Sequence, residues 1–192
     1  FYRLGDFYEM LFDDAIIASR ELELTLTGRD CGLEERAPMC GVPHHACDVY
    51  LKKLIEKGYN VAICEQTMDP AMCKGIVPRE VIRVVTPGTL IESSMLDETS
   101  NNYICAFYMR AKESALCLAD ISTGEVHLFE FEGKEMTSSA INELSRFSPA
   151  EILINDAFLS NKELSSFIRE KLKTSVQLLE ENDFSPEIHP EE

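Results

Sequence analysis

The sequence predicts a mixed α/β fold arranged in two domains. Strand-like and helix-like segments alternate over residues 1–88, while residues 103–192 give the order of three strands, helix, strand, helix and strand. A polar, acidic segment rich in Ser, Thr and Asn lies between the two patterns. We therefore expect a first domain at 1–88, a linker at 89–102 and a second domain at 103–192, which is truncated at its carboxyl end.

In the first domain, the aromatic-rich alternation at the start of residues 1–12 predicts a strand. The acidic residues Asp13 and Asp14 then open an amphipathic helix that we expect to end near Leu22, because acids stabilise the positive end of a helix. The run TLTGRD predicts a short strand, and the charged residues 30–37 that follow predict a loop.

A second helix is expected from about Ala46 to Lys57, ended by Gly58. Its apolar positions keep roughly to one face and are Val49, Leu51, Leu54 and Ile55. The runs VAICEQ and REVIRVV predict two buried strands, the second closed by a Pro-Gly turn.

In the second domain, the runs YICAFYMR, ALCLADIS and GEVHLFEF predict an antiparallel meander. Turns at Lys112–Glu113 and Thr123–Gly124 join its strands. A helix at 134–146, a short buried strand in AEILIN, a helix at 160–171 and a weak strand at 174–179 complete the pattern.

Composition and charge limit the classes of function. A hydrophobic share of 45% in 192 residues is ordinary for a globular protein with a real core, and no apolar run is long enough to span a bilayer. The net charge of −16 argues against coating of nucleic acid through charge alone. Residues 1–90 hold 10 basic and 14 acidic residues, against 8 and 20 in the remainder, so only the first part can present a local basic face.

The seven cysteines predict neither disulfides nor a zinc site. Their number is odd, no CxxC pair occurs, and several stand in apolar strand-like runs, which indicates reduced thiols in the cytosol. Cys40, His44, His45 and Cys47 place four potential ligands within eight residues. Their spacing matches no structural zinc pattern, so a polar loop that opens a helix is the better interpretation, and we expect no metal.

The stretch GDFYE at residues 5–9 raises a question of function. In a strand, Phe7 and Glu9 share one face, while Tyr8 points the opposite way with Asp6 and Met10. A phenyl ring that points outward can stack on or wedge between nucleic-acid bases. From the pattern alone, a core phenylalanine beside a solvated glutamate is the simpler interpretation.

Four segments favour the nucleic-acid role of Phe7 over the core role: FYRLGDFYEMLFDDA, APMCGVPHHA, VAICEQTMDP and VIRVVTPGT. Together they resemble the beginning of the MutS family of DNA mismatch-repair proteins, most specifically over residues 1–90 and less distinctively through ADISTGEVHL. The resemblance implies a mixed-sheet mismatch-binding domain followed by a ribonuclease-H-like connector domain.

The resemblance also implies site residues. Phe7-Tyr8-Glu9 matches the family's motif of an aromatic residue, any residue and glutamate. Phe7 would enter the minor groove and stack on a base at a mispaired site, where kinking costs less than in paired DNA. Glu9 would hydrogen-bond the displaced base and would penalise binding wherever no base atom can meet it, which disfavours correctly paired DNA.

Further DNA contacts are implied less specifically. Residues Pro38, Met39 and Gly41 match a family loop that approaches the DNA near the wedge, and Gly41 would let backbone amides come close to phosphate. His45 fits the family pattern better than His44. The basic residues expected near the duplex, with a solvated surface charge as an equal alternative for each, are Lys74, Arg79 and Arg83.

The partners implied by the resemblance are mismatched double-stranded DNA and downstream repair proteins such as MutL, which would dock on the connector. The full-length protein would be a cytoplasmic homodimer without a membrane segment, associated with the nucleoid when bound to DNA. No GxxxxGK[ST] stretch occurs, so ATP and Mg²⁺ would bind outside these residues, and we expect no catalytic residue or cofactor within them.

Two alternatives stay open. The chain could be a connector module that docks proteins without binding DNA by itself. It could also be a metal-dependent nuclease, since paired carboxylates serve such chemistry, with Asp120 and either Glu125 or Glu151 as the candidates. Asp120 ends a strand and opens a turn, so a structural role is the stronger interpretation.

Overall fold

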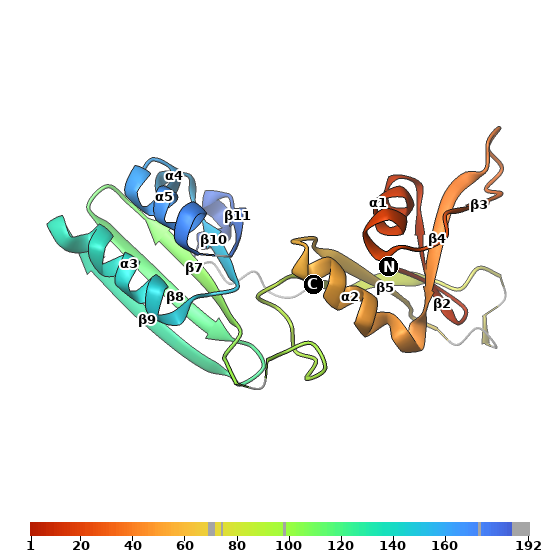
Figure 1. Cartoon of the computed structure of the whole chain (residues 1–192), viewed down its shortest axis with the longest axis horizontal. Helices are drawn as coiled ribbons and strands as arrows, with labels where there is room; N and C mark the ends of the chain where they lie inside the picture. Colours follow the sequence, from red (N-terminus) through yellow and green to blue (C-terminus); the bar gives the residue numbers. More distant parts are fainter. Residues whose placement is uncertain (69–71, 74, 98, 173, 186–192) are drawn as a thin grey trace. The chain divides into compact units, whose positions relative to one another are not determined.

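The computed structural model describes residues 1–68, 72–73, 75–97, 99–172 and 174–185. The chain divides into two compact units, Phe1–Thr86 and Pro87–Glu192 (Figure 1). Each unit combines one mixed β-sheet with helices, which confirms the predicted α/β class. Within the described residues no helix is long and apolar enough to cross a membrane.

The first unit is built on a six-stranded sheet in the order β3-β4-β2-β1-β5-β6. Neighbouring strands are antiparallel except for β1 and β5, which are parallel. The strands are β1 Tyr2–Leu4, β2 Phe7–Leu11, β3 Thr27–Arg29, β4 Ala37–Pro43, β5 Val61–Gln66 and β6 Arg79–Val85. The helices are α1 Phe12–Leu22, the short 3-10 helix η1 His44–Ala46, and α2 Cys47–Glu56.

The aromatic start of the chain forms a hairpin where a single strand was predicted. Leu4 pairs with Phe7, so Gly5 and Asp6 form a two-residue turn between β1 and β2. Gly5 has φ of +59°, which glycine adopts without steric cost at the first central position of a hairpin turn. The turn sets the register that makes Phe7 the first residue of β2.

Helices α1 and α2 pack on one face of this sheet. The apolar side chains of that face, together with the inner faces of the two helices, form the core: Tyr8, Met10, Ala15, Ala18, Leu22, Cys40, Val42, Leu51, Leu54, Ile55, Val61 and Ile63. Val49 was predicted on the apolar face of α2, but its side chain is 60% exposed. That prediction was wrong because the buried face of α2 is set by Leu51, Leu54 and Ile55.

Two segments of the first unit differ from their predicted form. Residues Pro38–Pro43, expected as a loop, belong to β4, which is paired on both sides within the sheet. Strand β6 was expected to be buried, yet Val81, Ile82 and Val84 are 59%, 62% and 51% exposed. The reason is position: β6 is the last strand of the sheet, with a neighbour on one side only.

The second unit contains a five-stranded sheet in the order β11-β10-β7-β8-β9. Three antiparallel strands form the predicted meander, and β10 and β11 extend it in parallel from β7, which is the ribonuclease-H-like arrangement. The strands are β7 Tyr103–Met109, β8 Glu113–Asp120, β9 Glu125–Glu132, β10 Glu151–Ile154 and β11 Ser175–Leu178. The helices are η3 Gly133–Glu135, α3 Met136–Phe147, α4 Asp156–Leu159, α5 Lys162–Lys171 and η4 Glu181–Phe184.

The core of the second unit lies between this sheet and its α-helices. Phe107 of β7 and Phe158 of α4 are almost fully buried and meet edge to face, with ring centroids 5.1 Å apart. Gly88 approaches β10 so closely that a Cβ there would lie 2.8 Å from atoms of Glu151 and Ile104. Its amide donates to Glu151 Oε2 at 3.0 Å, so Gly88, expected as the last residue of the first domain, packs with the second unit.

Candidate nucleic-acid interface

The sheet of the first unit presents its second face outward, and β2 places the GDFYE residues on it. Phe7 is 48% exposed on this face, whereas Tyr8 and Met10 are each 6% exposed and point toward the helices. The predicted alternation is therefore confirmed for Phe7, Tyr8 and Met10. It was wrong for Asp6, which is exposed in the hairpin turn before β2. Because β2 is paired with β1 on one side and β4 on the other, the phenyl ring stands on an inner strand of the sheet.

Tyr8 anchors β2 from the helix side. Its hydroxyl donates a hydrogen bond to Glu65 of β5, and the Arg3 guanidinium lies 5.6 Å from the centre of its ring. Arg3 Nη1 also lies 3.6 Å from Glu65 Oε1, so the three side chains form one polar cluster across the sheet. Burial, together with the hydrogen bond to the Glu65 carboxylate, raises the pKa of Tyr8 to about 12.

We predict a matching pH dependence. The phenol of Tyr8 should ionise near pH 12 rather than near its ordinary value of about 10. Since folding raises this pKa, the contribution to stability is fully present below pH 10 and is lost as the pH rises toward 12. Absorbance at 295 nm during an alkaline titration should show a late step to which both Tyr8 and Tyr103 contribute, because burial raises the pKa of Tyr103 as well. Tyr8→Phe should reduce the amplitude of this late step. An unchanged late amplitude in Tyr8→Phe would contradict the assignment.

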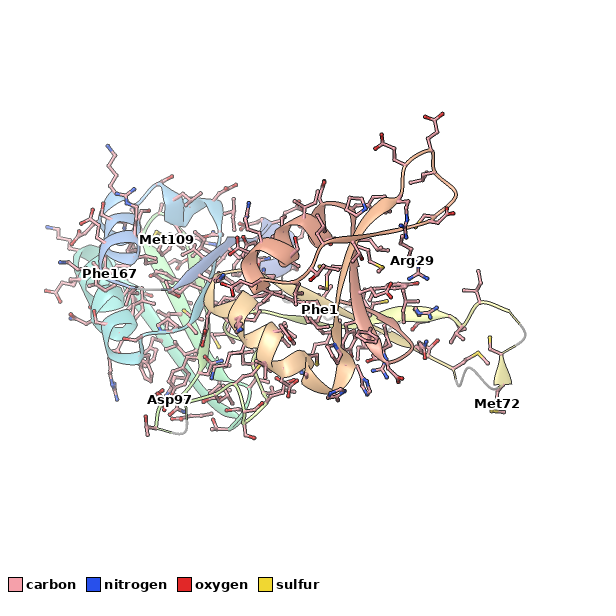
Figure 2. The ribbon with its side chains drawn as sticks, turned by 45° about the vertical axis from the view of Figure 1, so that its right-hand side comes forward. Phe1, Arg29, Met72, Asp97, Met109 and Phe167 are labelled. Carbon is pink, nitrogen blue, oxygen red and sulfur yellow. The ribbon has the colours of Figure 1, made fainter. Side chains whose placement is uncertain are left out.

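Glu9 has a partner that the sequence did not predict. Its carboxylate accepts a hydrogen bond from Arg29 Nη1, and the two side chains form an ion pair across the sheet face. Arg29 ends the edge strand β3, and its side chain points back toward the sheet (Figure 2). Nothing in the sequence marks this pair, because the two residues meet only through the strand order β3-β4-β2.

Gly41 leaves the space that the Glu9 side chain uses. The two residues are opposite each other in the β2–β4 register. A Cβ at Gly41 would lie 3.2 Å from the Tyr8 carbonyl oxygen and 3.5 Å from Glu9 Cγ. Glycine is thus favoured here by close packing inside the sheet, a different reason from the approach to phosphate that the resemblance implied.

The structure brings some of the other candidate residues to the same face. Met39 is opposite Leu11, which shares the face of Phe7 and Glu9. Arg79 lies 5.3 Å from the ring centre of Tyr2, which is itself opposite Glu9. Arg79 also donates to the carbonyl oxygens of Arg3 and Val77, each at 2.7 Å, so its guanidinium is held by the protein.

Other candidates lie elsewhere. Pro38 alternates with Met39 on β4, and Arg83 is opposite the buried Ile63, so both belong to the helix side of the sheet. His45 is exposed in η1, beside the turn that His44 contacts through a 2.9 Å hydrogen bond from its amide to the Asp6 carbonyl oxygen. Lys74 lies outside the described residues.

The cysteine and histidine cluster is divided by the fold. Cys40 is 1% exposed, and its thiol donates to the Ala15 carbonyl oxygen of α1 at 3.4 Å. Burial raises the pKa of this thiol, as it does for Cys105 in the second unit, so both behave as core side chains. In the part of the chain that the structure describes, no group of three or more His, Cys, Asp or Glu side chains is arranged to hold a metal ion.

Asp120, the candidate residue of the nuclease alternative, accepts hydrogen bonds within a turn. Its Oδ1 accepts from the amide of Ser122 at 2.9 Å and the hydroxyl of Ser122 at 2.6 Å, and Oδ2 accepts from the Asn102 amide at 3.2 Å. Burial alone would raise the pKa of Asp120, but these hydrogen bonds outweigh it and lower the pKa below the usual range. The side chain thus has the bonding of a structural turn residue.

Comparison with known proteins gives the class to which this fold and site belong. The family model for MutS domain I matches residues 1–94, and the model for MutS domain II matches residues 102–189. The chain is 51% identical over 184 residues to the DNA mismatch repair protein MutS of Ruminiclostridium cellulolyticum. It is 49% identical over 188 residues to the protein of that name from Acetivibrio thermocellus.

These alignments cover 96% and 98% of this chain but 21% and 22% of the two relatives. The chain therefore spans about a fifth of the length of the curated relatives it matches. It belongs to the MutS family, and it carries that family's domains I and II.

Proposed function

We propose that the first unit recognises mispaired or unpaired bases in double-stranded DNA, with Phe7 as an aromatic wedge. One observation carries the proposal: a half-exposed phenyl ring and a carboxylate stand side by side on the outward face of an inner strand, in a chain of the MutS family. A core role for Phe7, the simpler interpretation from the pattern alone, does not fit an exposure of 48%.

The free energy of DNA deformation favours binding at a mispaired site over binding to fully paired DNA. Inserting the ring between base pairs unstacks one step and kinks the duplex, at a cost of a few kcal/mol. A mispaired step is already loosened, so the same deformation costs less there. Stacking of a base on an aromatic side chain returns about 1–3 kcal/mol in either case. The difference in cost therefore selects errors without reading sequence.

Glu9 adds a second means of selection. A carboxylate close to phosphates lowers affinity unless it finds a hydrogen-bond donor. A displaced base can supply that donor beside Phe7, whereas the minor groove of paired DNA offers acceptors at every base pair and a donor only at the guanine amino group. Glu9 therefore weakens binding to correct DNA more than binding to an error.

Glu9→Gln is expected to raise affinity for fully paired DNA more than affinity for a G·T duplex, so that discrimination falls by about tenfold. Fluorescence anisotropy with two duplexes that differ in one base pair measures both affinities. Asp6→Asn is the matched control, because it removes the same charge at the adjacent exposed turn. Unchanged affinity for paired DNA in Glu9→Gln would refute the repulsion argument.

A second function has its own supporting observation. Val126 and Leu128 of the edge strand β9 are 62% and 66% exposed, which favours protein docking on the second unit. We propose MutL-type repair proteins as partners there, and a homodimer and ATP-driven steps for the longer protein, through regions beyond those matched here. If the chain shows no preference for a G·T duplex, docking becomes its principal function.

A further inference from the structure

We propose that Arg29 is the counter-ion of Glu9 and sets how strongly Glu9 rejects paired DNA. This inference rests on the proposed function, because it assigns a regulator to the same wedge site. Arg29 would act through Glu9, as a positioning residue, and would not read the DNA bases.

The geometry of the ion pair supports this role. Glu9 lies on the inner strand β2 and Arg29 on the edge strand β3, with β4 between them. The hydrogen bond from Arg29 Nη1, opposite Ala37, to Glu9 Oε2, opposite Gly41, therefore crosses β4. Among the described residues, Arg29 is the one cation within ion-pair distance of Glu9.

The two side chains of the ion pair differ in their exposure to solvent. The Glu9 side chain is 17% exposed and that of Arg29 is 42% exposed. The carboxylate is thus largely covered, while the guanidinium keeps access to solvent and to an approaching phosphate. With Oε2 bound to Arg29, the carboxylate can offer Oε1 to a base beside Phe7.

The charges of the pair explain how Arg29 changes selectivity. On paired DNA, a Glu9 carboxylate that meets no base donor remains with Arg29, which reduces its repulsion of the phosphates without removing it. On a mispaired site, the base itself satisfies the carboxylate. Loss of Arg29 should therefore expose the full penalty of Glu9 on paired DNA, and a smaller penalty on mispaired DNA.

The test compares Arg29→Gln with Arg36→Gln, an exposed residue whose loss removes the same charge from the β3–β4 loop. Both variants should lose affinity, but Arg29→Gln should lose about fivefold more on a paired duplex than on a G·T duplex. Arg29→Lys should restore most of the wild-type ratio. In a Glu9→Gln background, Arg29→Gln should no longer change the ratio.

Two results would overturn the proposal. One is an equal loss on both duplexes for Arg29→Gln, as for Arg36→Gln. The other is independent of DNA: nuclear Overhauser contacts between the Arg29 guanidinium and the Glu9 side chain should appear in the free chain, and their absence would show that the pair does not form. Failure of the proposed function is distinguishable, because then the wild type itself would not prefer the G·T duplex.

Discussion

Phe7→Ala is expected to abolish the preference for mismatched DNA that we propose for this chain, while leaving its fold intact. The substitution removes the stacking surface, worth about 1–3 kcal/mol per base, which corresponds to roughly a 5- to 150-fold loss on a G·T duplex. The ring contributes little to the core because it is 48% exposed, so the free energy of unfolding should change by less than about 0.5 kcal/mol.

Anisotropy with a G·T duplex and a paired duplex measures the first effect, and urea unfolding measures the second. Phe12→Ala is the matched control, since Phe12 is 50% exposed but begins α1 and does not belong to β2. Retention of the mismatch preference in Phe7→Ala would remove the basis of the proposed function. An equal loss in Phe12→Ala would indicate a general apolar contact in place of a wedge.

The second large effect concerns stability. Phe107→Ala is expected to destabilise the second unit by about 3–5 kcal/mol, because it removes a side chain with no exposed surface and leaves the ring of Phe158 without its edge-to-face neighbour. Since the two units have separate cores, the first unit should keep its own unfolding transition.

Urea unfolding followed by the environment of Tyr8 and by far-ultraviolet circular dichroism would resolve the two transitions. Leu128→Ala serves as the control in the same sheet, because this side chain is 66% exposed and its loss should cost less than about 0.5 kcal/mol. A Phe107→Ala chain as stable as the wild type would show that the core around β7 repacks without a cavity.

The sequence predicted the second unit well because its strands carry strong local signals. Alternation in β7 and β8 and turns at fixed positions each act over a few residues, so local patterns locate them. The resemblance to a family added the fold type. Residues 89–102 as a linker remain a prediction, as do the DNA contacts of the individual side chains.

The first unit was harder to predict because its features depend on strand order. Pro38 and Gly41 are typical loop residues, yet they stand in an inner strand. The apolar run of β6 is typical of a buried strand, yet the end of the sheet leaves it exposed. The Arg29–Glu9 pair joins residues that are 20 positions apart through two strand pairings, which no local pattern encodes.

The two pairings of β2 also have a mechanical consequence. A side chain on a loop can give way when it meets resistance, but Phe7 stands on a strand held by β1 and β4, with Tyr8 tied to Glu65 beneath it. When a side chain held this rigidly enters a duplex, the more flexible of the two partners deforms. Recognition would then depend on the local deformability of the DNA, because the sheet that carries Phe7 is the more rigid of the two partners.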